Sequence, residues 1–299
     1  MYLPTVGAAI ALSTGLLSIV ERLRLRLAPE LQLTMALLLT AGPLGIATYA
    51  RNLVWKDEIT LWNNVVSKSP RKARLRTILS LVYTANGKLD DALRESLEAI
   101  RLDPRDSYAR NNLGVVYQAK GRIEEAVREY REAIRLQPRQ AEAHSNLADV
   151  WNATGQFDAA MRECQEAIRL DPALPEARVN LGTAYAGKRR IEDAVRELRE
   201  AIRLKPALTE AHAQLGNAYV AKGQLDDAVR ELQEAIRLDP RNAKLHDDLA
   251  NAYRSKGEFD DAAREHRGAL RLDPGLAQTR TPLGEAYKAK GPTDGAVRE

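Results

Sequence analysis

The sequence has almost no cysteine. Cys164 is the only one among 299 residues, so an internal disulfide and a zinc site built from cysteines are both excluded. Aromatic residues are also scarce, at 5% of the chain, and the motifs of phosphate-binding loops, metalloproteases, dinucleotide folds and serine nucleophiles are missing. We therefore expect no catalytic residue, no metal and no cofactor. With 44% hydrophobic and 29% charged residues, the composition is nevertheless that of a folded protein.

The excess of positive charge is confined to one end of the chain. The sequence has 45 Lys and Arg against 41 Asp and Glu, a formal net charge of +4. Residues 1–72 hold eight of the basic and four of the acidic residues, which leaves 37 of each in residues 73–299. A long neutral segment does not provide the basic stripe that follows a phosphate backbone. We expect no nucleic-acid partner.

Two uncharged stretches occupy the N-terminal end. Residues 1–20 and 31–50 contain no Asp, Glu, Lys or Arg, and each is close to the ~20 residues that a helix needs to cross a bilayer. The charged connector 21–30 would join them, so we expect residues 1–50 to insert into the lipid bilayer as two transmembrane helices. Buried soluble helices remain an alternative, because proline and glycine interrupt both stretches.

Basic residues give an expected orientation of this hairpin. Arg22, Arg24 and Arg26 favour a cytoplasmic connector, which would place the chain after residue 50 on the non-cytoplasmic side of the membrane. Further basic residues between 51 and 72 favour the opposite orientation.

A period of 34 residues organises the rest of the chain. Proline recurs at this spacing from Pro70 to Pro274, and Ala-Ile-Arg-Leu-x-Pro closes most units. Counted from three residues after each proline, position 7 is leucine, position 8 is small, position 11 is Tyr or Trp, and position 20 is alanine. The predicted units are 73–106, 107–140, 141–174, 175–208, 209–242 and 243–276, with a partial unit at 277–299. Residues 51–72 are predicted to form a juxtamembrane helix that caps the first unit as a half-repeat.

These residues at this spacing resemble the tetratricopeptide repeat (TPR) family, over residues 73–299. Leu at position 7 and the aromatic residue at position 11 share one helical face, and small residues at positions 8 and 20 let two helices approach closely. Glycine near position 15 ends the first helix of each unit except the fourth, which has Arg189. The predicted fold is all-α, a TPR superhelical solenoid of α-α hairpins preceded by a two-helix membrane hairpin.

Position 6 carries the candidate peptide-binding residues. A row of side-chain amides on the concave side can donate to and accept from a peptide backbone whatever the peptide's sequence. Asn112, Asn146 and Asn180 resemble the asparagine ladder in the TPR superhelix of O-linked N-acetylglucosamine transferases. Asparagine is also common here in TPRs generally, so a structural role stays open. The candidates are Asn112, Asn146, Asn180 and Gln214.

Other recurring residues are interpreted as structural. His144, His212 and His246 recur at position 4, but helices 8–10 Å apart cannot bring them to one zinc ion, so we expect packing residues. Cys164 is expected to be a small buried hydrophobe. Pairs such as Arg94 with Glu98 are expected on helix surfaces. Position 5 has no lysine, which argues against a clamp for a terminal carboxylate.

The N-terminal part carries a second resemblance. The segments Met1-Tyr-Leu-Pro-Thr-Val-Gly7 and Thr48-Tyr-Ala-Arg-Asn-Leu-Val-Trp-Lys-Asp-Glu58 resemble the last membrane segments and juxtamembrane helix of TPR-containing GT-C O-mannosyltransferases. The resemblance implies a TPR array on the non-cytoplasmic side. No catalytic residue carries over, because the family's acidic residues lie in an early loop that has no counterpart here.

The expected function is that of a membrane-anchored scaffold, which binds a protein or an extended peptide in the concave groove of its TPR array. One alternative is a non-catalytic C-terminal fragment of a membrane GT-C glycosyltransferase; a truncated chain would also account for the partial unit 277–299, after which no polar capping helix follows. The other alternative is a soluble TPR co-chaperone or assembly factor.

Overall fold

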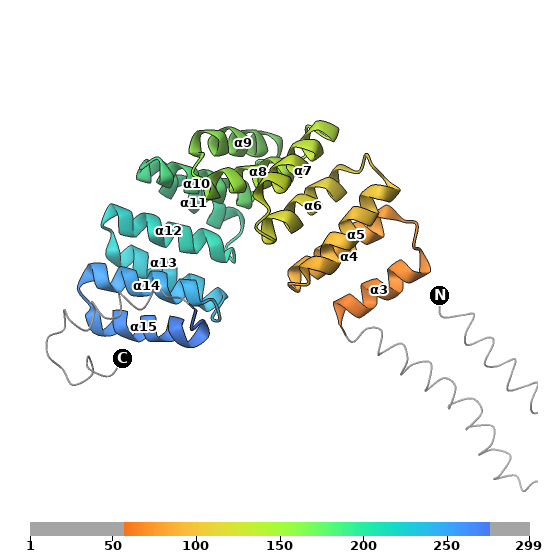
Figure 1. Ribbon diagram of the computed structural model, residues 1–299. Helices are drawn as coiled ribbons and strands as arrows, with labels where there is room; N and C mark the ends of the chain where they lie inside the picture. Colours follow the sequence, from red (N-terminus) through yellow and green to blue (C-terminus); the bar gives the residue numbers. More distant parts are fainter. Residues whose placement is uncertain (1–56, 276–299) are drawn as a thin grey trace, which may run out of the picture. The chain divides into compact units, whose positions relative to one another are not determined.

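The computed structural model describes residues 57–275, which form thirteen α-helices and no strand (Figure 1). None of these helices is both long and apolar enough to span a bilayer. The two predicted membrane helices lie outside the described residues. The helices are α3 Glu58–Lys68, α4 Ala73–Ala85, α5 Leu89–Leu102, α6 Ser107–Ala119, α7 Ile123–Leu136, α8 Ala141–Ala153, α9 Phe157–Leu170, α10 Pro175–Gly187, α11 Ile191–Leu204, α12 Thr209–Lys222, α13 Leu225–Leu238, α14 Ala243–Lys256 and α15 Phe259–Leu272.

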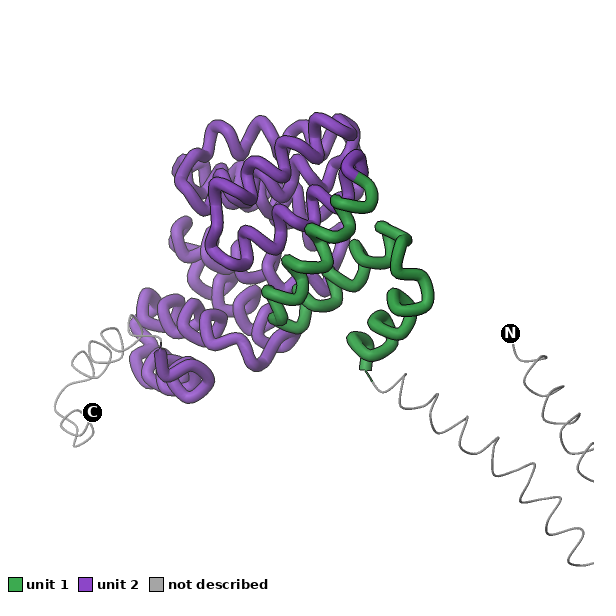
Figure 2. Tube along the Cα trace, turned by 45° about the vertical axis from the view of Figure 1, so that its right-hand side comes forward, with its two compact units in different colours: residues 1–103 green, residues 104–299 purple. Residues whose placement is uncertain are grey.

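The chain divides into two compact units, residues 1–103 and 104–299 (Figure 2). In the described part of the first unit, α3 packs on α4 and α4 pairs with α5. Asp57 is the N-cap of helix α3, and its carboxylate accepts the amide of Thr60 at 2.8 Å, which satisfies one of the free N–H groups of the first turn. In the second unit, the helices pair as five successive hairpins, α6 with α7 through α14 with α15.

A left-handed residue ends the first helix of each hairpin. In the α6–α7 turn, Gly121 has φ +71°, and the amide of Arg122 donates to the Tyr117 carbonyl at 2.8 Å. Arg189 adopts the same conformation in the fourth repeat, with φ +59°, and the equivalent bond from Arg190 to Tyr185 is also 2.8 Å. The turn therefore forms without glycine, although a side chain in this region is strained by about 1 kcal/mol.

Positions 8 and 24 fit together within each hairpin of the second unit, where a small residue on the first helix faces a larger one on the second. A Cβ placed on Gly182 would lie 2.7 Å from Cγ of Leu198, and one on Gly216 would lie 2.6 Å from Cγ of Leu232. In the third repeat, alanine at position 8 accompanies the smaller Cys164, which is fully buried as predicted. The residue at position 8 thus sets how much volume its partner can have.

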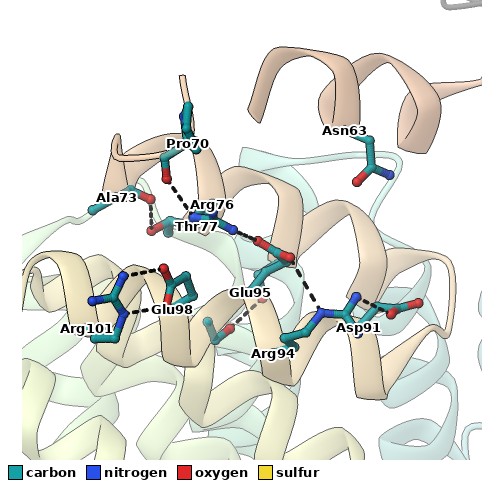
Figure 3. A network of polar contacts seen from close by, with 12 residues as sticks. Asn63, Pro70, Ala73, Arg76, Thr77, Asp91, Arg94, Glu95, Glu98 and Arg101 are labelled. Atoms are coloured by element: carbon teal, nitrogen blue, oxygen red, sulfur yellow. Dashed lines mark hydrogen bonds and ion pairs between the residues drawn. The ribbon is translucent and has the colours of Figure 1, made fainter. Parts of the chain in front are cut away.

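A second contact inside each hairpin joins a basic residue at position 4 to a glutamate at position 23. In the first repeat, Arg76 donates to Oε2 of Glu95 at 2.6 Å and to the carbonyl of Pro70 at 3.0 Å (Figure 3). Arg76 on α4 therefore forms hydrogen bonds both to α5 and to the turn that precedes α4. The equivalent pairs are Arg110–Glu129 at 2.8 Å, His144–Glu163 at 2.7 Å, Arg178–Glu197 at 2.9 Å, His212–Glu231 at 2.7 Å and His246–Glu265 at 2.7 Å.

The recurring histidines have a more specific role than packing. Both ring nitrogens of His144 face an acceptor, since Nδ1 lies 2.7 Å from Glu163 and Nε2 lies 3.2 Å from the Pro138 carbonyl. Burial lowers the pKa of His144, but these two hydrogen bonds outweigh it and hold the pKa above its ordinary value. A doubly protonated ring satisfies both acceptors. No cluster of three metal-ligating side chains occurs within residues 57–275.

Replacing Gln140 with leucine is expected to stabilise the second unit. The Gln140 side chain is 2% exposed, and neither its nitrogen nor its oxygen has a hydrogen-bond partner in the described structure. The same repeat position carries leucine at 174 and 208. Because a buried unpaired amide is unfavourable by roughly 1–3 kcal/mol, we expect Gln140→Leu to raise the free energy of unfolding by about 1–2 kcal/mol in urea titrations.

Asp106→Leu serves as the matched control at this repeat position. Asp106 accepts the amides of Tyr108 at 2.9 Å and Ala109 at 3.1 Å, so its loss removes a helix cap and is expected to lower the urea midpoint. An unchanged or lower midpoint for Gln140→Leu would contradict the prediction.

Candidate peptide-binding surface

The first helices of the second unit lie on one side of the stack. Consecutive first helices contact one another along the series α6, α8, α10, α12 and α14, whereas within residues 104–275 no second helix contacts another second helix. The stack therefore curves with its first helices on the inside of the bend. The side of the first helices that faces away from the second helices is called the inner face. We use this name for positions 2, 6 and 9. These residues are Tyr108, Asn112, Val115, Glu142, Asn146, Asp149, Glu176, Asn180, Thr183, Glu210, Gln214, Asn217, Lys244, Asp248 and Asn251.

The four predicted site residues lie on four successive first helices. Asn112 on α6 is buried, with 8% exposure, whereas Asn146 on α8, Asn180 on α10 and Gln214 on α12 are half-buried. Asn146 donates from Nδ2 to Oδ1 of Asn111 at 3.0 Å, which joins α8 to the preceding repeat. The Asn146 amide is thus held by the preceding repeat.

The orientation of the Asn180 amide is fixed by a backbone group. Its Nδ2 donates to the carbonyl of Ser145 at 3.0 Å and lies 3.2 Å from the Ser145 hydroxyl. A carbonyl only accepts, so the nitrogen of Asn180 must point to the preceding repeat. Its Oδ1 is then the atom left for a ligand, and this side chain offers an acceptor.

Gln214 behaves differently from the asparagines. Its Nε2 donates to Oε1 of Glu210 at 2.6 Å, one turn earlier on α12, so it does not bridge to the preceding repeat. At the same repeat position α14 carries Asp248, which accepts a hydrogen bond of 3.3 Å from Asn217. The amide bridges therefore stop at Asn180, and acidic side chains follow.

Sequence reasoning missed the carboxylates of this face. Asp149 on α8 accepts a 2.6 Å hydrogen bond from Gln118 on α6. Burial raises the pKa of Asp149 and of Asp248, and repulsion from Glu210 raises both further. Glu210 on α12 is thus within electrostatic reach of carboxylates on α8 and on α14. Glutamate recurs at position 2 as Glu142, Glu176 and Glu210, which is a signal in the 34-residue period, whereas Asp149 and Asp248 each occur once at their repeat positions and leave none.

The surface charges of the second helices pair differently from the prediction. Arg94 contacts Asp91 at 2.6 Å, and Glu98 is bound by Arg101 at 2.6 Å, so the spacing is three residues and the expected pair of Arg94 with Glu98 is wrong. The bidentate fit of the Arg101 guanidinium occupies both oxygens of Glu98. These exposed pairs neutralise one another and carry no chemistry.

Two family models match the chain. Residues 81–121 match a TPR repeat model. Residues 104–299 match the TPR family model described as the C-terminal domain of cilia and flagella-associated protein 70. The chain belongs to this TPR family. Its described part is an all-α TPR array, as the sequence predicted.

Known proteins extend the TPR comparison. Over 92 residues, the chain is 33% identical to the protein O-mannosyl-transferase Tmtc1 of Drosophila melanogaster, a match that covers 31% of this TPR chain and 10% of that protein. The chain thus spans only about a tenth of this curated relative. The similarity agrees with the O-mannosyltransferase resemblance of the sequence.

Solved structures share the TPR fold. The Cut9–Hcn1 hetero-tetramer of APC/C superposes with a TM-score of 0.71 at 22% identity, covering 77% of this chain and 46% of that chain. A thermophilic TPR protein of Thermus thermophilus has a TM-score of 0.55 at 25% identity, covering 61% and 99%. The first likeness concerns the fold alone.

Proposed function

We propose that this TPR chain is a membrane-anchored scaffold whose inner face binds an extended segment of another protein. The observation that carries the proposal is the row of ordered polar side chains on consecutive first helices, with the Asn180 amide held so that its oxygen is available. An extended peptide exposes backbone N–H groups along its length, which such acceptors can bind without reading its sequence. Binding, and not catalysis, is the proposed activity of these residues.

The test uses a peptide selected from a phage library of random twelve-residue sequences and measured by fluorescence anisotropy. We expect Asn112→Ala, Asn146→Ala and Asn180→Ala, combined in the full chain, to weaken binding about tenfold. Gln165→Ala with Gln233→Ala removes exposed amides from the second helices and is expected to have less than a twofold effect. Unchanged affinity in the asparagine variant would overturn the proposal, provided that circular dichroism shows the variant folded.

Anchoring through residues 1–50 is part of the same proposal. The uncharged stretches 1–20 and 31–50 support it, and the arginines of the connector support a non-cytoplasmic location of the array. We expect the chain to stay with membranes after carbonate extraction and its array to be protected from protease added to the cytoplasmic side. Full release into the soluble fraction would contradict anchoring.

A second candidate is favoured by the similarity to Tmtc1. In it, the chain is the non-catalytic TPR part of a larger membrane O-mannosyltransferase-like protein and presents polypeptide to a sugar-transferring domain. In-frame codons upstream of Met1 that encode further membrane spans and an acidic loop would support this candidate. A stop codon immediately upstream would support the small anchored scaffold instead.

A further inference from the structure

Arginine neutralises acidic residues of the second helices within the helix itself. Arg135 binds Glu132 at 2.7 Å, Arg203 binds Glu200 at 2.7 Å, and Arg237 binds Glu234 at 2.6 Å. Each pair recurs at the same repeat positions. These carboxylates already have a cationic partner, so they offer little charge to another protein.

Three carboxylates of the inner face have the opposite property, although a fourth, Glu176, is paired with Lys205 at 3.1 Å. Asp149, Glu210 and Asp248 accept hydrogen bonds from neutral amides, which are those of Gln118, Gln214 and Asn217. Within residues 57–275, no Lys or Arg forms an ion pair with any of the three carboxylates. Lys244 acts on Asp248 at longer range, and Asp247 beside it adds repulsion. Negative charge therefore accumulates on this face although the chain as a whole carries a net charge of +4.

The three carboxylates act within one surface. They belong to α8, α12 and α14, and Glu210 repels both of the others. Burial and repulsion from Glu210 make the charged forms of Asp149 and Asp248 less favourable than in water, and a cation placed beside them would relieve both effects. The Asn180 amide adds an acceptor on the intervening helix α10, so the side chains of this stretch bind donors.

Given the peptide-binding function proposed above, we propose that the inner face selects an extended segment rich in Lys or Arg. The spacing of the cations follows from geometry. Neighbouring packed helices lie about 8–10 Å apart, and three residues of extended chain span roughly 10 Å. A cation at every third residue therefore meets successive first helices. The cations opposite α8, α12 and α14 reach carboxylates, and the residue opposite α10 reaches the amide oxygen of Asn180.

The experiment measures fluorescence anisotropy with the full chain and three labelled peptides. The first has four Lys-Ser-Ser triplets, and the others have Gln or Glu in place of Lys. We expect the lysine peptide to bind about tenfold more tightly than the glutamine peptide, the glutamate peptide not to bind, and added NaCl to weaken the lysine peptide.

Two matched variants test the location. Asp149→Asn, Glu210→Gln and Asp248→Asn, combined, remove three charges from the inner face and are expected to weaken the lysine peptide at least about tenfold. Glu132→Gln, Glu200→Gln and Glu234→Gln remove three charges from the second helices and are expected to change its affinity less than twofold. Equal losses in both variants would overturn the proposal, because they indicate attraction by net charge alone.

The remaining outcomes separate this inference from the proposed function. If the glutamine peptide binds as tightly as the lysine peptide and the asparagine variant weakens both, peptide binding stands and the selection for cations is wrong. If the library-selected peptide binds but none of the three designed peptides does, the selection for cations is again the part that fails. If the asparagine variant leaves every bound peptide unaffected, the proposed function fails.

Discussion

Gly182→Ala is expected to lower the free energy of unfolding of the second unit by about 2–3 kcal/mol. The added methyl would lie 2.7 Å from Cγ of Leu198, which is 1% exposed and held in the core between α10 and α11. Overpacking of this kind forces side chains off their rotamers or separates helices, typically at 1–3 kcal/mol. Alanine has a higher helix propensity than glycine, which would contribute up to ~1 kcal/mol of stability. We expect the steric clash with the buried Leu198 side chain to cost more than this gain. Urea titration followed by circular dichroism measures the change.

Leu198→Cys tests whether the loss comes from this contact. Alanine at position 8 occurs naturally opposite Cys164 in the third repeat. Leu198→Cys alone leaves a cavity and is expected to be destabilising. The double variant Gly182→Ala with Leu198→Cys reproduces the pair of the third repeat. We expect its loss of unfolding free energy to be smaller than the sum of the two single losses by at least ~1 kcal/mol. Additive losses would show that the two side chains do not compete for the same space.

Arg178→Ala is expected to be about as damaging, at roughly 2–3 kcal/mol. The side chains of Arg178 and Glu197 are 18% and 14% exposed, and their contact of 2.9 Å joins α10 to α11. Removing the guanidinium leaves a largely buried carboxylate without its cation, which is worse than removing both partners. The loss is expected as a lower urea midpoint with little change in the helix signal of the folded state.

Arg178→His provides the conservative comparison. Histidine fills this position at 144, 212 and 246 and reaches the same glutamate at 2.7 Å in each case. We expect this variant, measured at pH 6, to lose less than half as much stability as Arg178→Ala. Arg203→Ala removes an exposed arginine from the same hairpin, with 67% of its side chain accessible, and should leave the midpoint nearly unchanged. Equal losses for alanine and histidine would contradict the assigned contact.

The local features of the hairpins could be predicted from the sequence because they repeat. Leucine at position 7, the small residue at position 8 and the glycine of the turn follow directly from the spacing, and Arg189 shows that the pattern holds where one residue departs from it. Position 4 is different. The spacing predicts packing residues there, and the bond of His144 to Glu163 depends on where two helices cross, which the spacing does not specify.

The inner face was harder to predict for a different reason. The bond from Asn180 to Ser145 joins residues one period and one residue apart, a register that aligned repeats do not display. The field shared by Asp149, Glu210 and Asp248 involves residues at three different repeat positions. Such contacts depend on how hairpins stack, and stacking follows from tertiary packing, which a single-unit pattern does not contain.

The packing contact between positions 8 and 24 lies inside one 34-residue unit. The hydrogen bond between the basic residue at position 4 and the glutamate at position 23 lies inside the same unit. A unit that is copied or deleted whole therefore carries its own compensating residues with it, and the array can change length without losing either pair. The amide bridges do not travel in this way, because each needs its upstream neighbour. Lengthening of the array by gene duplication would thus conserve the stability of each hairpin while changing which polar atoms of the inner face are paired between repeats.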